Sequence, residues 1–230
     1  MDQLNIMKIY FTALFFCLIS IRILAQTNYT GIYSYSYPIN MELTDLKPSK
    51  EDGGPSGEII LAKKDGDRYI FWLNISRGWP SYNMGYMVGE MEIKNGKAKH
   101  IHKDDYSEGS CILDFEITPA RIEIKSDGYE NCGFGHAVYA DGTYRKSKKL
   151  LTNTYLFTTM EDAGNEGIIK NEKAIIYKDS NLTIPTKQYF IKKDKVYTTE
   201  VSAKARYVHY IAKGQKYVYG WLRKEDLQTK

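Results

Sequence analysis

The sequence predicts an all-β protein, because short alternating segments recur along the chain with turn signals between them. Residues 111–117 alternate apolar and polar side chains, which is the period-2 pattern of a half-buried strand. A turn at Thr118-Pro119-Ala120 separates them from residues 121–125, which alternate again as a returning strand. The chain also holds 20 tyrosines and only 6 prolines, a composition that favours strands over helices. We therefore expect antiparallel sheets.

Residues 1–25 differ from the rest and are predicted to be a secretory signal peptide. Lys8 gives a charged start, residues 9–24 are almost wholly apolar, and Ala25 offers a small residue for cleavage. The alternative is a retained membrane anchor, which Arg22 and the modest length of the apolar run disfavour. After cleavage we expect a protein without stable membrane insertion, located in the periplasm or outside the cell.

The predicted export also determines how the cysteines are expected to pair. Removal of residues 1–25 takes away Cys17 and leaves Cys111 and Cys132, an even number in an oxidising compartment. The sequence therefore predicts one disulfide between Cys111 and Cys132. A bond that closes a loop of about 20 residues contributes roughly 3 kcal/mol, mostly by restricting the unfolded chain.

Residues 28–149 are predicted to form a first domain, an antiparallel barrel or sandwich. Asn95-Gly96 is the strongest turn signal, because both residues adopt the backbone conformation that a two-residue hairpin requires. Short strands at regular spacing, without a convincing helix between them, indicate this class of fold. Besides residues 111–125, the expected strands are residues 29–37, 58–62, 68–75, 85–93, 97–102, 136–140 and 143–146.

The layout of this first domain resembles that of small exported bacterial β-barrel domains. The resemblance rests on Gly31-Ile32-Tyr33, Cys111, Cys132-Gly133-Phe134-Gly135 and Asp141-Gly142-Thr143-Tyr144. Some barrels of this kind are lysozyme inhibitors, so the resemblance raises an inhibitor function as one hypothesis.

Residues 150–166 are predicted to be a linker, and residues 167–230 to be a second, smaller β-barrel. Its expected strands are residues 173–177, 188–191, 195–201, 206–212 and 217–222. The second segment resembles a bacterial SH3 (SH3b) domain, with Lys193 where that family usually carries glycine. The motifs that carry the resemblance are Ala174-Ile175-Ile176-Tyr177, Tyr189 to Val196, Tyr207-Val208-His209-Tyr210, Gly220-Trp221-Leu222 and Asp226-Leu227. It implies an SH3-like barrel with non-catalytic binding in the cell envelope. It also implies a ligand groove lined by aromatic residues at Tyr177, Tyr189 and Trp221, with Tyr210 as a neighbour.

Charge separates the two halves. Residues 26–165 hold 16 basic and 20 acidic residues, a net charge of −4, whereas residues 166–230 hold 14 basic and 7 acidic residues, a net charge of +7. A cationic module of this kind suits anionic glycans, peptidoglycan stems or an acidic protein face. The alternative is that these lysines only confer solubility. We expect a cell-wall component or an envelope protein as partner, and no nucleic acid, because an Arg-rich patch is missing.

No residue pattern names a reaction. Cys132 and His136 could form a nucleophile and its base, but a disulfide removes the thiol. His100, His102 and His136 could form a metal site, since His100 and His102 share one face of a strand, but no third ligand is evidently placed to complete it. We therefore expect no catalytic residue, metal or cofactor.

The aromatic residues indicate a binding function more strongly than these patterns indicate a reaction or a metal site. Trp72, Trp79, Tyr82 and Tyr86 gather around one loop of the first domain, and exposed clusters of this kind suit recognition of peptides or sugars. The alternative is that these rings fill small β cores. The favoured hypothesis is an exported, non-catalytic binding protein that recognises a peptide, glycan or protein partner. The alternatives are an inhibitor or immunity protein against a wall-degrading enzyme such as a lysozyme and, third, a hydrolase.

Overall fold

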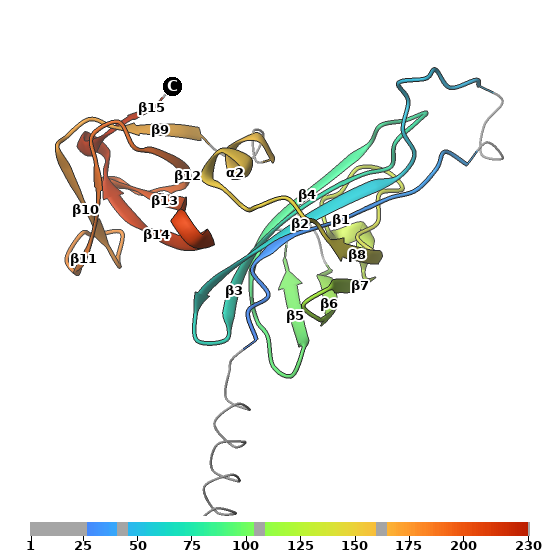
Figure 1. Ribbon diagram of the computed structural model, residues 1–230, viewed down its shortest axis with the longest axis horizontal. Helices are drawn as coiled ribbons and strands as arrows, with labels where there is room; N and C mark the ends of the chain where they lie inside the picture. Colours follow the sequence, from blue (N-terminus) through green and yellow to red (C-terminus); the bar gives the residue numbers. More distant parts are fainter. Residues whose placement is uncertain (1–26, 41–45, 104–108, 160–164, 230) are drawn as a thin grey trace, which may run out of the picture.

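The computed structural model describes residues 27–40, 46–103, 109–159 and 165–229. The predicted signal peptide, residues 1–25, lies outside these ranges. The described chain forms two curved antiparallel sheets that lie side by side (Figure 1). The predicted all-β class is confirmed. Within the described ranges, no helix has the length and apolar character needed to cross a membrane.

The first sheet is a near-closed barrel of eight strands in the order β4-β3-β2-β1-β8-β7-β6-β5. Its edge strands β4 and β5 approach each other where the His100 imidazole Nδ1 lies 3.0 Å from the Glu90 carbonyl oxygen. The strands are β1 (Gly31–Ser36), β2 (Ser56–Asp65), β3 (Arg68–Ser76), β4 (Met84–Glu92), β5 (Lys97–His102), β6 (Cys111–Ile117), β7 (Arg121–Asp127) and β8 (Gly142–Lys146).

Local sequence explains the hairpins of this barrel. Asn95 and Gly96 have φ angles of 52° and 74°, the pair of positive values that the turn between β4 and β5 needs. Alternate residues of β6 are buried, as the period-2 pattern predicts. The predicted disulfide is present between Cys111 on β6 and Cys132, which follows the short 3-10 helix η2 (Tyr129–Asn131).

One predicted strand is wrong. Residues 136–140 form turns and irregular backbone instead of pairing with β8. Gly133 and Ala137 have φ angles of 69° and 57°, which break an extended segment at two places. The loop packs on the start of β4, where the Gly135 amide donates to the Met84 carbonyl oxygen at 2.9 Å.

The second sheet is a curled half-barrel of seven strands in the order β11-β10-β14-β13-β12-β9-β15. Leu222, Val208 and Phe190 are among the buried residues on its concave side. Its strands are β9 (Asn165–Ile169), β10 (Lys173–Tyr177), β11 (Pro185–Ile191), β12 (Lys195–Val201), β13 (Ala205–Ala212), β14 (Lys216–Arg223) and β15 (Leu227–Thr229), with the 3-10 turns η3 (Lys213–Gln215) and η4 (Lys224–Asp226). The prediction did not include β9 and β15.

The two sheets share a hydrophobic core. Trp72 from β3 packs edge-on against His209 and Tyr217 of the half-barrel, with ring centroids 5.8 and 5.7 Å apart. The helix α2 (Asn153–Thr159) lies between the sheets and buries Leu156 in the same core (Figure 1). The predicted linker thus contains a helix that packs against both sheets, and the two sheets behave as one packed body.

Candidate functional site

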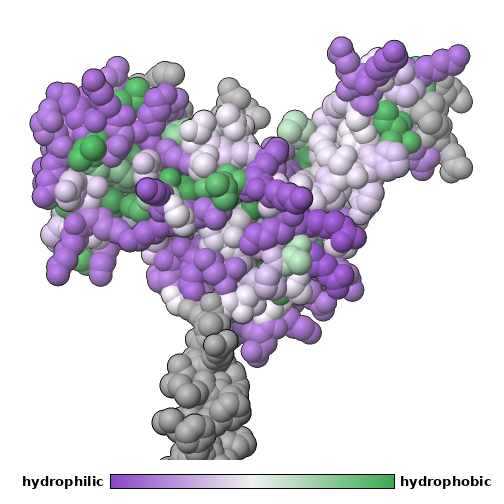
Figure 2. All heavy atoms as spheres, in the orientation of Figure 1, coloured by the Kyte–Doolittle hydropathy of each residue, from purple (hydrophilic) through white to green (hydrophobic). Residues whose placement is uncertain are grey.

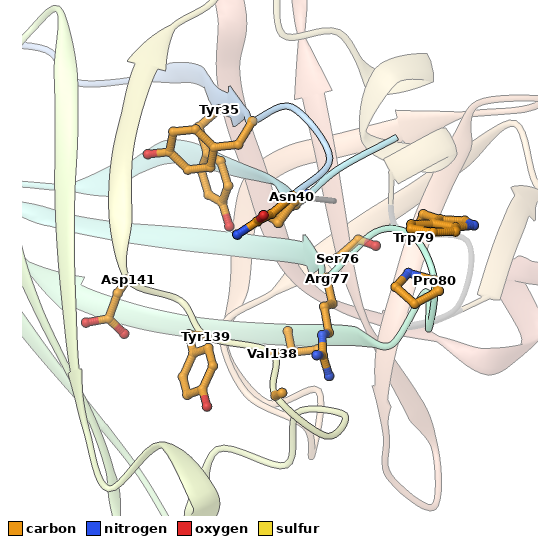
Figure 3. Close-up of a pocket in the computed structure, with 12 residues that line it drawn as sticks. Tyr35, Asn40, Ser76, Arg77, Trp79, Pro80, Val138, Tyr139 and Asp141 are labelled. Atoms are coloured by element: carbon orange, nitrogen blue, oxygen red, sulfur yellow. The ribbon is translucent and has the colours of Figure 1, made fainter. Parts of the chain in front are cut away.

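One end of the first barrel carries a pocket of about 430 Å³ (Figure 3). Four stretches of the chain line it: the end of β1 with the residues after it, Pro55 before β2, the end of β3 with the loop that follows, and the segment that precedes β8. The side chains that give the pocket its character are Tyr35, Tyr37, Arg77, Trp79, Tyr139 and Asp141. Aromatic walls with a few polar groups are typical of small-ligand sites.

Two glycines allow the loops on one side of this pocket to pack closely. A Cβ atom at Gly54 would overlap the backbone of Tyr37 and Pro38, and one at Gly78 would overlap the backbone of Gly54. Gly78 also has a φ of 70°, a conformation that favours glycine. The Trp79 amide donates to the Gly53 carbonyl oxygen at 2.8 Å. These contacts hold the backbone of Trp79 in place.

The opposite wall is formed by the segment between β7 and β8, which the disulfide ties to β6. The ring centroids of Tyr139 and Tyr129 lie 4.8 Å apart in an edge-to-face pair. The Asp141 carboxylate accepts hydrogen bonds from the Ser126 hydroxyl and, at 3.1 Å, from the Ser126 amide. Because Cys132 ties this loop to β6, the bond keeps the Tyr139 side of the pocket in place.

The pocket presents one cation and one anion among its aromatic rings. In Figure 3 the Arg77 side chain extends between the loop that bears Trp79 and the segment that bears Val138, while Asp141 lies farther along the wall. A guanidinium donates paired hydrogen bonds to a carboxylate, and Trp and Tyr rings pack on apolar or sugar faces. The arrangement suits a ligand that combines a carboxylate with a flat, partly apolar body.

The aromatic residues predicted for the SH3-like segment do not all meet in one groove. Tyr189 and Tyr210 line a shallow groove of about 270 Å³ together with Lys187. Tyr189 is half exposed, and the Lys173 ammonium lies 4.5 Å from its ring centroid. Tyr210 packs edge-on against Phe190 at 5.3 Å. This groove therefore contains two of the four predicted residues.

The other two predicted residues lie elsewhere on the same sheet. Tyr177 and Trp221 face each other across β10 and β14. Tyr177 is buried, and the Arg223 guanidinium donates to its hydroxyl at 2.9 Å. Trp221 is half-buried, with its ring centroid 5.3 Å from that of Tyr207.

The four aromatic residues predicted to gather around one loop of the first domain also lie in different places. Trp72 and Tyr86 point toward the shared core between the sheets, whereas Trp79 lines the pocket. Tyr82 is exposed and its hydroxyl donates to the Asp52 carboxylate, whose pKa is lowered chiefly by that bond. The prediction missed Tyr35, Tyr37, Arg77, Tyr139 and Asp141 as pocket residues. The Arg-Gly-Trp-Pro sequence at residues 77–80 was the available signal, because glycine beside an aromatic residue marks close packing in a loop.

The histidines weighed as metal ligands lie in other settings. The His100 ring packs edge-on against Phe71 at 5.0 Å, and burial lowers the pKa of its imidazole. Among the described residues, no group of three or more His, Cys, Asp or Glu side chains could hold a metal ion.

Comparison with family models, curated proteins and solved structures finds no match to this chain.

Proposed function

We propose that this protein is an exported, non-catalytic binding protein of the cell envelope and that the barrel-end pocket holds its ligand. The observation that carries the proposal is the pocket of about 430 Å³ with Arg77 among four aromatic rings. Tyr35 and Tyr139 contribute rings from opposite sides of the pocket (Figure 3). Glycine-packed loops and a disulfide support the walls, so little conformational entropy is lost when a ligand enters.

Export is part of the same proposal. Disulfides form and persist in oxidising compartments, so the Cys111–Cys132 bond supports a location outside the cytoplasm. The ligand class that fits both that location and the pocket chemistry is a cell-wall fragment. Muropeptides, which join sugars to a short peptide with free carboxylates, offer the flat body and the anion that the rings and Arg77 accept.

Titration of residues 27–230 with soluble muropeptides tests the proposal. Trp79 lines the pocket, so binding is expected to change tryptophan fluorescence, and Trp79→Phe should remove that change. Arg77→Gln should weaken binding by about 1–2 kcal/mol. Arg121→Gln is the matched control, because Arg121 is an exposed arginine on β7 of the same barrel. Equal affinities of the two arginine variants, or no binding by the native protein, would refute the assignment.

Inhibition of a wall-degrading enzyme is the second proposal. The β3–β4 loop projects at the pocket end of the barrel beside residues 46–55, which suits insertion into an enzyme cleft (Figure 1). A lysozyme-type muramidase that loses activity at equimolar protein, and regains it with Trp79→Ala, would favour this function. An unaffected muramidase would eliminate it.

A further inference from the structure

A second depression, of about 500 Å³, lies at the junction of the two sheets. The hairpin between β2 and β3 passes close to β14 there (Figure 1). Both sheets line the depression, which we call the junction cleft. Tyr207 and Tyr219 contribute aromatic surface, and Thr186 and Gln188 add neutral polar groups. This cleft is separate from the barrel-end pocket, because the two share no lining residue.

Contacts between the sheets fix the geometry of the junction cleft. The Tyr219 hydroxyl donates to the Asp65 carboxylate at 3.1 Å, and the Lys64 ammonium lies 4.7 Å from the Tyr219 ring centroid. Burial raises the pKa of Tyr219 to about 12, so its hydroxyl remains a donor near neutral pH. The Tyr207 ring is held edge-on between His209 and Trp221, with centroids 5.1 and 5.3 Å away.

The charges in the junction cleft fall into two groups. Lys64 is paired with Glu90, and the Arg68 guanidinium donates from Nε to Asp65 at 2.7 Å, so these charges are largely compensated. Lys178 and Lys216, in contrast, are exposed, and no ion pair of either one is present within the described part of the chain. The cleft therefore offers two exposed lysines beside tyrosine rings.

We propose that the junction cleft binds an anionic polysaccharide whose sugar units carry carboxylates. Tyrosine rings pack on the apolar faces of sugars, and the side chains of Thr186 and Gln188 hydrogen-bond to hydroxyl groups. Lys178 and Lys216 attract the carboxylates. Because Lys64 and Arg68 are paired with acidic side chains, Lys178 and Lys216 remain as the cations for a ligand, a small number that suits one carboxylate per sugar unit. Nucleic acid carries a far denser charge, roughly one per 1.7 Å of duplex axis, and would need more cations.

The wider surface supports an anionic partner. On the face shown in Figure 2, hydrophilic residues dominate the surface of the half-barrel. Residues 166–230 hold 14 basic and 7 acidic residues, so the half-barrel as a whole attracts anions.

Calorimetric titration of residues 27–230 with oligogalacturonate tests this proposal. The native protein should bind the uronate and not dextran, its neutral counterpart, and added salt should weaken binding. The double variant Lys178→Gln/Lys216→Gln should raise Kd by roughly tenfold. The matched control is Lys204→Gln/Lys224→Gln, which removes the same charge from lysines that line a different depression of the half-barrel. Arg77→Gln should leave uronate binding intact, which separates this site from the barrel-end pocket.

Three outcomes would overturn the proposal. One is equal Kd values for the two double-lysine variants, which would place binding outside the junction cleft. Another is equal affinity for dextran, which would remove the role of charge. The third is poly-L-glutamate binding at least as tightly as the uronate, which would assign the cleft to an acidic protein instead of a glycan. To confirm that the tyrosine faces participate, Tyr207→Leu should weaken uronate binding while circular dichroism shows an intact fold.

Discussion

His209 should make the contact between the two sheets sensitive to acid. The side chain is 3% exposed and lies in the shared core against Trp72. Its Nδ1 is 2.6 Å from the Tyr217 hydroxyl and its Nε2 is 2.8 Å from the Thr199 hydroxyl. A neutral imidazole satisfies both partners, one as donor and one as acceptor. Burial, and to a smaller extent the positive charge of Lys64, lower its pKa from 6.5 to about 3.

The magnitude follows from proton linkage. Between pH 6.5 and 3 the unfolded chain holds a proton on His209 and the folded chain does not, so the free energy of unfolding falls as the pH falls through this window. Two pH units below 6.5, at about pH 4.5, the loss is on the order of 3 kcal/mol. The full contribution is retained above pH 6.5. A loss of this size is a large part of the stability of a typical domain.

Chemical denaturation at a series of pH values from 7 to 4.5 measures the effect. Trp72 fluorescence reports the core that contains His209. The measurement stops at pH 4.5 because the carboxylates with shifted pKa values, such as those of Asp65 and Asp179, titrate below the ordinary aspartate value. The hydrogen bond from Arg68 is the main cause of the lowered pKa of Asp65. The backbone amides of Thr183 and Ile184, together with the Thr183 hydroxyl, lower the pKa of Asp179.

Three variants identify the group responsible. His209→Gln can still hydrogen-bond to Tyr217 and Thr199, but it should lose the larger part of the dependence on pH, and the remainder is expected from His100, whose pKa burial also lowers. His136→Gln, at an exposed histidine, should keep the native dependence. Lys64→Gln should reduce the dependence slightly, because it removes the like charge that contributes to the lowered pKa. If His209→Gln loses stability between pH 7 and 4.5 as steeply as the native protein does, the reasoning about His209 is wrong.

Three further predictions concern single features. Reduction of the Cys111–Cys132 bond, which spans 21 residues, should lower the free energy of unfolding by about 3 kcal/mol in urea titrations, and two alkylatable thiols in the native protein would contradict the bond. Tyr177→Ala should cost about 3 kcal/mol because Tyr177 is buried, whereas Tyr189→Ala should cost less than about 1 kcal/mol; similar melting temperatures for the two variants would contradict this contrast. Gly78→Ala should weaken muropeptide binding and lower the melting temperature, because its Cβ would overlap the Gly54 backbone, and native values for both would show that the loops can move apart.

The sequence predicts most of the strands because turn chemistry and alternation are local signals. The strands predicted at residues 97–102, 173–177 and 195–201 have the bounds that the structure shows. Asn95-Gly96 sets the β4–β5 turn through two positive φ angles, which depend on those residues alone. The strands β9 and β15 were missed because they are short and because their partners lie far along the chain. β9 pairs with β12 and with β15, and no local pattern reveals such pairings.

The shared core between the sheets could have been inferred from two continuous apolar runs. Ile59-Ile60-Leu61-Ala62 and Tyr69-Ile70-Phe71-Trp72-Leu73 are buried on both faces of their strands. A strand with one face in water alternates, whereas a strand covered on both faces does not. These runs therefore predict that a second layer covers β2 and β3. Which segment supplies that layer depends on the tertiary fold and could not be read from the runs themselves.

The aromatic residues of the half-barrel show why composition alone could not separate groove from core. Alternate positions of β13 and β14 project toward the first barrel, and Tyr217 lies at the end of β14 where that barrel covers it. Tyr219 and Trp221 follow on the same face of β14 and are only half-buried, because the first barrel does not extend over them. Tyr207 pairs with Trp221 across the strands and lines the junction cleft. One row of rings thus stabilises the contact between the sheets at one end and remains open to a ligand at the other. The same alternation of side chains produces the buried rings and the ligand-accessible rings, and how far the first barrel extends along β14 decides which rings are buried.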